Sequence, residues 1–188
     1  MPEKGDRLKT LLHVCCGPCA SSCIPRLREE GIDGITLLFA NSNIDTREEF
    51  EKRKAAAEVL AKAEGVKIET LEYDHGDWLE KVAKGFENEP EKGRRCERCF
   101  RYNLAKAAEY AARNGFDAYT TSLTVSPHKV TGMIFAAASA AAPFLEMDFK
   151  KKEGFKKSVG RATELGLYRQ AYCGCEFSKA ESEKRSGK

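Results

Sequence analysis

Seven of the eight cysteines fall into three short groups whose spacing could hold a metal or carry out thiol chemistry. A structural zinc ion takes four ligands, so seven thiols exceed what one such site needs. The same number suits a four-cysteine iron–sulfur cluster, with thiols left over for a second metal or for redox work. The groups are Cys15, Cys16 and Cys19, then Cys96 and Cys99, and finally Cys173 and Cys175.

The spacing within each group indicates how its sulfurs could face one site. A Cys-x-x-Cys pair at a helix start, as in Cys96 and Cys99, directs both sulfurs the same way, near amide groups that favour thiolates. Gly174 would let the chain turn tightly enough for its two flanking cysteines to face one ion. The neighbours Cys15 and Cys16 would point to opposite sides of an extended chain, so they serve either two centres or one centre and a turn.

Other uses of these thiols stay open. The tetrapeptide Cys16-Gly-Pro-Cys19 is typical of a thioredoxin-type site, so the first alternative is a thiol–disulfide oxidoreductase. That chemistry gives no role to five of the seven thiols, and we therefore favour metal binding. A zinc-stapled RNA-binding module is the second alternative. The charged, glutamine-poor composition is typical of thermophiles, some of which keep intracellular disulfides. Cys23, one helical turn past Cys19, is interpreted as a small buried hydrophobe.

Charge is unevenly distributed along the chain. From Phe149 to Lys188 there are eleven Lys and Arg residues against five Glu, a net +6, whereas the whole chain carries only +3. This basic C-terminal region, from about residue 149, suits a polyanionic partner such as RNA. A solvated lysine-rich tail explains the final ten residues equally well.

Length and hydropathy indicate a small protein without a membrane anchor. With 188 residues and 41% apolar side chains, we expect a single domain over residues 1–188. No apolar run approaches the eighteen residues of a spanning helix, so no membrane partner is expected. The charged first ten residues lack the features of a secretory signal. We therefore expect a cytoplasmic protein, where thiols are kept reduced.

The candidate thiols must be positioned by an alternation of strands and helices. Buried or alternating runs predict strands over 8–14, 34–41, 66–73, 117–123 and 143–149. Helical patterns run from residue 17 to about 30, over 46–65, 76–86 and 96–115, behind Pro127 and over 154–166. This order predicts an α/β, doubly wound, mainly parallel, Rossmann-like sheet with helices on both faces. Ligands of such sheets bind beyond the carboxyl ends of the strands, where the unusual motifs fall.

Six motifs, in order, carry a resemblance to a known family. Together they resemble the QueH-type epoxyqueuosine reductases over about residues 11–177. The resemblance implies the HUP, or adenine nucleotide alpha-hydrolase-like, fold. The motifs are HVCCGPC (13–19), NSNI (41–44), RRCERCF (94–100), SPHK (126–129), DFKKKEGFKKS (148–158) and LYRQAYCGC (167–175).

The resemblance also implies an activity and its cofactors. Members of this family reductively remove the epoxide oxygen of epoxyqueuosine in a tRNA anticodon loop, which leaves queuosine. They are expected to carry a [4Fe–4S] cluster and a separate mononuclear iron, and to take electrons from an external low-potential donor. The family's thiol pattern falls on the seven grouped cysteines, and which of them hold the cluster stays open. A carboxylate could complete the second site, with Asp74 as the candidate and Asp45 and Asp148 as rivals.

Several further side chains are candidates for acid–base chemistry or RNA contacts. We expect a helix to begin within SPHK, with His128 as proton donor and Lys129 as phosphate contact, although Ser126 could simply cap that helix. Tyr168, Arg169 and Gln170 offer stacking and hydrogen bonds to a splayed base, or else brace the turn that follows them. The lysines and the arginine of the basic region could follow the tRNA backbone; these are Lys150, Lys151, Lys152, Lys156, Lys157 and Arg161.

Overall fold

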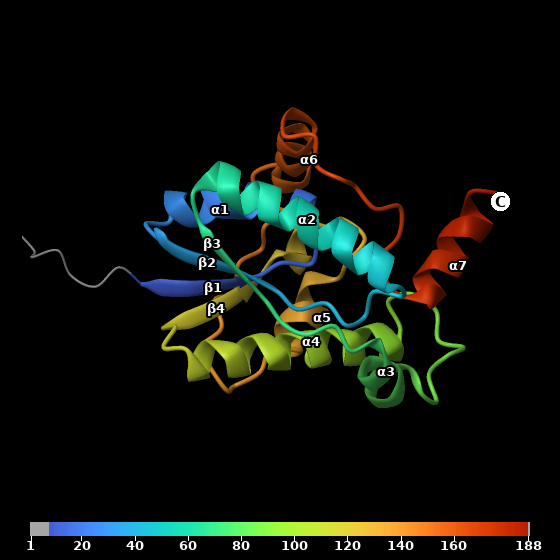
Figure 1. The fold of residues 1–188 in the computed structure, drawn as a ribbon. Helices are drawn as coiled ribbons and strands as arrows, with labels where there is room; N and C mark the ends of the chain where they lie inside the picture. Colours follow the sequence, from blue (N-terminus) through green and yellow to red (C-terminus); the bar gives the residue numbers. More distant parts are fainter. Residues whose placement is uncertain (1–7, 188) are drawn as a thin grey trace, which may run out of the picture.

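The computed structural model describes residues 8–187 and contains one parallel sheet between two layers of helices (Figure 1). The strand order is β3-β2-β1-β4, and every neighbouring pair is parallel. The first seven residues, interpreted above as lacking a secretory signal, lie outside the described range. The strands are β1 (Lys9–His13), β2 (Gly34–Phe39), β3 (Lys67–Thr70) and β4 (Ala118–Thr121).

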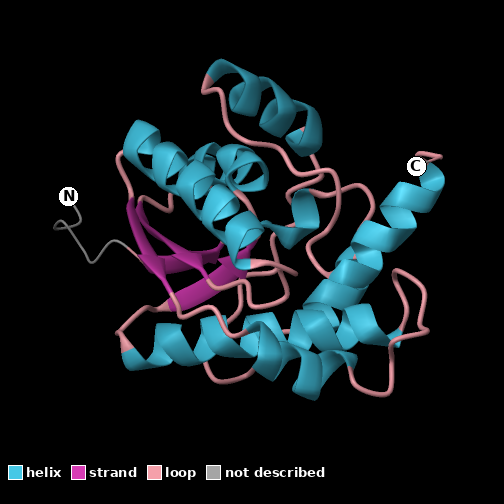
Figure 2. Ribbon diagram, turned by 45° about the vertical axis from the view of Figure 1, so that its right-hand side comes forward, coloured by secondary structure: helices cyan, strands magenta, loops and turns pink. Residues whose placement is uncertain are grey.

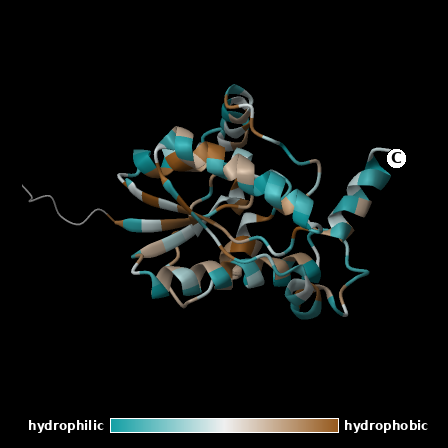
Figure 3. Cartoon of the chain, in the orientation of Figure 1, coloured by the Kyte–Doolittle hydropathy of each residue, from teal (hydrophilic) through white to brown (hydrophobic). Residues whose placement is uncertain are grey.

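Helices cover both faces of the sheet (Figures 1 and 2). One apolar cluster joins the sheet to α1, α2 and α6, and a second joins its other face to α4 and α5. Figure 3 shows hydrophobic and hydrophilic residues interleaved along the helices that cover the sheet. The helices are α1 (Gly17–Glu29), α2 (Arg47–Glu64), α3 (His75–Trp78), α4 (Arg94–Arg113), α5 (Thr131–Ala136), α6 (Gly154–Glu164) and α7 (Glu176–Arg185), with a π-helical turn η1 (Leu79–Ala83) and a 3₁₀ turn η2 (Ser122–Val125).

Local sequence explains where these helices begin and end. The Thr46 side chain caps α2 by accepting the N–H of Glu49, and Gly65 ends that helix in the left-handed conformation with φ 66°. At the start of α1, a Cβ on Gly17 would lie 2.7 Å from the carbonyl oxygen of Ala56, so only glycine lets α1 and α2 approach this closely. The predicted doubly wound parallel α/β fold is confirmed.

The predicted fifth strand over 143–149 was wrong. Only Phe144 forms a bridge, pairing in parallel with Tyr119. Pro143 has no N–H to continue a ladder, and the N–H of Met147 bonds to Leu145 of the same segment instead. The segment therefore follows the edge of β4 without becoming a strand.

Three predicted helix boundaries were also wrong. SPHK forms a turn, in which the Lys129 N–H bonds to the Ser126 carbonyl, and α5 begins only at Thr131. The helix that carries the second cysteine pair begins two residues earlier than predicted, at Arg94, and the predicted helix over 76–86 ends at Ala83. Residues 176–185 form α7, whose last turn is exposed, so the described part of the solvated lysine-rich end is helical.

None of the helices in the described part of the chain is both long and apolar enough to cross a bilayer.

Candidate metal centre and active site

The site lies at the point where the strand order reverses. The chain runs from β1 outward to β3 and then crosses over to place β4 on the other side of β1, which opens a crevice at their carboxyl ends. Cys15 follows β1, and Ser122 follows β4. The Cys15 N–H donates to Ser122 Oγ at 3.0 Å, and that hydroxyl lies 3.3 Å from Cys15 Sγ. The thiols therefore begin where ligands of this fold class bind.

Cys15, Cys16 and Cys19 form an inner triad whose sulfurs all lie within 4.8 Å of one another. Cys16 is the N-cap of α1, and its sulfur accepts the N–H of Cys19 at 3.4 Å. The cap turns the chain sharply after β1. Cys15 and Cys16 therefore face one centre rather than the two sides of a strand, which decides between the alternatives left open by the sequence.

The three thiols of the inner triad hydrogen-bond one another, which shifts their pKa values. Hydrogen bonds from Cys16 and Cys19 lower the pKa of Cys15 well below its usual value. The same bond to Cys15, together with burial, raises the pKa of Cys16 to about 12, and the pKa of Cys19 is raised for the same reasons. Further thiolate charge in this triad needs a compensating cation, and a bound metal ion supplies one.

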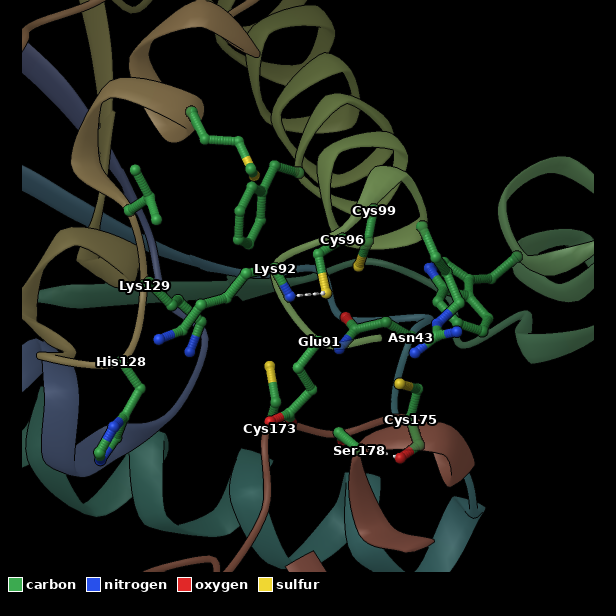
Figure 4. Close-up of a pocket in the computed structure, with 15 residues that line it drawn as sticks. Asn43, Glu91, Lys92, Cys96, Cys99, His128, Lys129, Cys173, Cys175 and Ser178 are labelled. Carbon is green, nitrogen blue, oxygen red and sulfur yellow. Dashed lines mark hydrogen bonds between the residues drawn. The ribbon is translucent and has the colours of Figure 1, made fainter. Parts of the chain in front are cut away.

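Cys96, Cys99, Cys173 and Cys175 form an outer quartet that lines a neighbouring cavity (Figure 4). The first two lie in the first turns of α4, and the other two lie in the loop that leads into α7. The N–H of Lys92 donates to Cys96 Sγ at 3.3 Å. Burial raises the pKa of Cys99 and of Cys175, and burial raises the pKa of Cys96 to about 11. These thiols also need a cation to become thiolates together.

A buried arginine fixes the loop that carries two of these thiols. Arg53 of α2 donates from Nη1 to the Cys173 carbonyl at 2.7 Å and from Nη2 to the Tyr172 carbonyl at 3.3 Å. Its Nε donates to Glu49 at 2.7 Å, and both side chains are buried. The loop is thus held by charge-assisted bonds from a helix far away in the sequence.

Gly174 lies at a bend of the chain, as expected, although its φ is not in the left-handed region, and it also packs closely against its neighbours. A Cβ at this position would lie 2.7 Å from Asn43 Nδ2 and 3.5 Å from Arg53 Nη1. The glycine therefore lets the thiol loop approach the residues that follow β2.

Buried polar side chains surround Cys99. Asn103, one turn further along α4, lies with Nδ2 3.6 Å from Cys99 Sγ and 3.1 Å from Asn43 Oδ1. Trp78 is fully buried, packs against Cys99 and Cys175, and its Nε1–H has no oxygen or nitrogen partner among residues 8–187. These groups offer hydrogen-bond donors to sulfur. No feature of the sequence indicated that Asn103 and Trp78 would lie beside Cys99, and only the folded structure shows it.

A larger cavity of about 560 Å³ connects the two thiol groups. The inner triad, Cys99 and Cys173 contribute to its wall, as do His128 and Lys129. This volume is within the range of small-molecule sites. The cavity therefore has room for a substrate that both thiol groups could reach.

His128 and Lys129 reach this cavity from the turn after η2, although no helix begins there. Burial alone would lower the pKa of Lys129, but the negative charge of Cys173 and of the inner triad raises it. Lys129 thus remains a cation beside the thiols. His128 is exposed at the cavity wall, where it can exchange protons with solvent.

The three candidate carboxylates each accept a hydrogen bond near the place where they lie in the fold. Asp74 caps α3 by accepting the N–H of Asp77 at 2.9 Å. Asp45 accepts the Tyr172 hydroxyl at 2.6 Å, and Asp148 accepts the Lys150 N–H at 3.2 Å. None of these aspartates is among the residues that line the two thiol cavities.

The candidate RNA-binding residues separate into two sets. Arg169 and Gln170 line the large cavity, as predicted, but Tyr168 does not, because its hydroxyl donates to Glu49 at 2.8 Å. Lys156 is exposed and paired with Glu153, and Lys157 lines a separate groove between α1 and α6. That groove is strongly basic; its charged side chains are Arg26, Glu29, Lys151, Lys152, Lys157 and Arg161.

The fold and site together define a doubly wound parallel α/β protein with a thiol-rich centre at its ligand crevice. Its sequence matches the model of the family "Epoxyqueuosine reductase QueH" over residues 10–181. The chain belongs to this family of oxidoreductases.

Curated relatives agree with this assignment. The chain is 37% identical to the epoxyqueuosine reductase QueH of Streptococcus pyogenes serotype M1, over 94% of this chain and 72% of that protein. It is 31% identical to that of Thermotoga maritima, over 93% and 92%.

The U34-tRNA thiolase NcsA of Methanococcus maripaludis, solved with its [4Fe-4S] cluster, shares the fold with a TM-score of 0.55 and 11% identity, over 97% of this chain and 66% of that one. NMN synthetase from Francisella tularensis gives 0.54 and 11%, over 96% and 78%.

Proposed function

We propose that this protein removes the epoxide oxygen of epoxyqueuosine in a tRNA anticodon loop by iron–sulfur chemistry. One observation carries the proposal: three segments far apart in the sequence bring seven thiols to two adjoining cavities at the ligand crevice of the sheet. Membership of the epoxyqueuosine reductase family supplies the reaction.

The donor sets suit the two cofactors. The outer quartet provides the four thiolates that a [4Fe–4S] cluster takes. The inner triad is compact enough for its sulfurs to bind a single iron, since metal–sulfur bonds are about 2.3 Å long. We therefore assign the cluster to the outer quartet and the mononuclear iron to the inner triad.

Removing an epoxide oxygen takes two electrons and two protons. Both carbon–oxygen bonds break, a carbon–carbon double bond forms, and the oxygen leaves as water. When bound, the metal centre supplies electrons and a Lewis acid for the leaving oxygen. His128 stands at the cavity wall to deliver a proton to that oxygen, and Lys129 stabilises its negative charge.

Other residues around the cavity bind the tRNA substrate. Arg169 and Gln170 face the cavity and can hydrogen-bond a base that leaves its stack. Lys156 lies on α6, and Lys157 lines the basic groove between α1 and α6. Both residues are next to that cavity, where they can follow the tRNA backbone. An external low-potential donor must provide the two electrons. All eight cysteines are free thiols, which suits the cytoplasm, where tRNA is available.

Nucleoside analysis tests the proposal. Anaerobically prepared protein, loaded with iron and sulfide and given dithionite, is incubated with tRNA that contains epoxyqueuosine. Mass spectrometry of the digested tRNA should show queuosine in place of the epoxide. Intact epoxide after incubation with iron-loaded protein would refute the proposed activity.

Thiol–disulfide exchange is less well supported by the site. Exchange through Cys16 and Cys19 gives no role to the other five grouped thiols, which line the same two cavities. Iron-free protein that reduces disulfides would favour that alternative. Zinc-containing protein that binds tRNA without changing it would favour the RNA-binding module.

A further inference from the structure

Phe155 places an exposed aromatic ring at the wall of the large cavity. It is the second residue of α6, and 39% of its surface is exposed. Phe155 lines the large cavity. Within residues 8–187 it belongs to no apolar cluster and forms no aromatic or cation–π pair. Packing within this chain therefore does not account for the ring.

The backbone beneath Phe155 is held firmly. Gly154 packs against the Phe149 carbonyl so closely that a Cβ could not be accommodated. One turn later, the Ser158 carbonyl accepts the Ser21 hydroxyl of α1 at 3.3 Å, and Ser158 is buried. The ring is thus presented on a rigid helix start, which lowers the entropy lost when a ligand stacks on it.

The same cavity contains an unused hydrogen-bond acceptor. Gln170 Oε1 is shielded from solvent and has no partner among the described residues. Arg169 and Tyr172, from the same segment, also line the wall. A flat aromatic face, a guanidinium and a free amide oxygen around one cavity are the groups by which proteins hold unstacked nucleobases.

We propose that Phe155 is the platform on which a nucleobase neighbouring the modified one stacks when the anticodon loop enters the cavity. The inference rests on the proposed tRNA substrate and adds a positioning residue to it. Tyr168, the aromatic residue that the sequence favoured for stacking, is instead engaged with Glu49 outside the cavity. Of the Phe and Tyr rings that line this cavity, Phe100 is buried and Tyr172 packs against the Arg53 guanidinium, which leaves Phe155 as the exposed ring without such a partner among the described residues.

The test measures binding of an unmodified anticodon stem–loop RNA to metal-loaded protein. Base–aromatic stacking contributes about 1–3 kcal/mol, so Phe155→Ala should weaken the affinity about 5- to 150-fold. Phe155→Tyr should bind nearly as tightly as the unsubstituted chain, whereas Phe155→Leu should not. Val59→Ala is the control, since Val59 is an exposed apolar residue of α2, with 49% of its surface accessible, and does not line this cavity.

Two readouts separate stacking from a merely structural role. The loss caused by Phe155→Ala should be the same at low and high salt, whereas the loss caused by Lys156→Ala should shrink with salt. A 2-aminopurine placed beside the target base should be quenched by the unsubstituted chain and by Phe155→Tyr, but not by Phe155→Ala. Equal affinity of Phe155→Ala, full rescue by Phe155→Leu, or no binding of the stem–loop by the unsubstituted chain would overturn the inference.

Its failure is distinguishable from that of the proposed function. Conversion of epoxyqueuosine in tRNA, together with Phe155-independent binding, refutes only the stacking platform. Phe155-dependent binding without conversion refutes only the reductase activity.

Discussion

Arg53 and Cys173 are joined by a 2.7 Å hydrogen bond from a buried guanidinium to a backbone carbonyl. The two residues are 120 positions apart in the sequence. Because Arg53 also binds Glu49 and the Tyr172 carbonyl, one side chain of α2 fixes the loop that carries half of the outer quartet.

Replacing this arginine should loosen the metal site and destabilise the fold. Arg53→Met leaves Glu49 buried without its partner, which costs about 3–5 kcal/mol in the free energy of unfolding. Denaturant unfolding measures the loss, and iron analysis should show reduced loading. On the same helix, Lys52→Met breaks an exposed pair with Glu48 and should change neither quantity. An Arg53→Met chain as stable and as iron-rich as the Lys52→Met chain would contradict the role of Arg53.

Gly174→Ala should disturb the site through Asn43. The new methyl group must displace the Asn43 amide, which is bonded to Asn103 beside Cys99. We expect lower iron content and slower epoxide removal. Gly160→Ala, on α6 with open space around it, should leave iron content unchanged and stabilise the helix by about 0.5–1 kcal/mol. Wild-type iron content in Gly174→Ala would show that the close approach is unimportant.

Substitutions in the inner triad and in the outer quartet should remove different cofactors. Cys99→Ser should lower both iron and acid-labile sulfide, because it removes a cluster ligand. Cys16→Ser should lower iron with little loss of sulfide, because the single ion contains none. Cys23→Ala should retain both, since the Cys23 thiol is buried and donates only to the Cys19 carbonyl. Parallel iron and sulfide assays decide, and sulfide loss in Cys16→Ser would overturn the proposed partition.

Asp74 should affect stability rather than metal binding. Asp74→Ala removes the cap of α3 and should cost about 1 kcal/mol, whereas Asp74→Ser should restore it because serine also caps helices. Thermal unfolding and iron analysis of both variants check this. Should Asp74→Ser lose iron while keeping its stability, the carboxylate would be a ligand after all.

Much of the site could be predicted because strand ends are readable in the sequence. Parallel strands bring their carboxyl ends to one edge, so cysteines after β1 and at the start of α4 had to gather there. The segment 143–149 was misread as a strand because its apolar pattern does not reveal that it pairs with β4 only at Phe144, after which the Met147 N–H bonds back to Leu145. The position of Phe155 at the cavity and the packing of Gly174 against Asn43 could not be found, since both depend on contacts between distant segments.

The central claim is that two thiol groups hold iron at the crevice of the sheet. The most direct test is to measure iron and acid-labile sulfide per chain in anaerobically reconstituted protein. One four-iron cluster and one lone iron predict about five irons and four sulfides per chain. Iron-free or zinc-only protein that still converts epoxyqueuosine in tRNA would contradict the account.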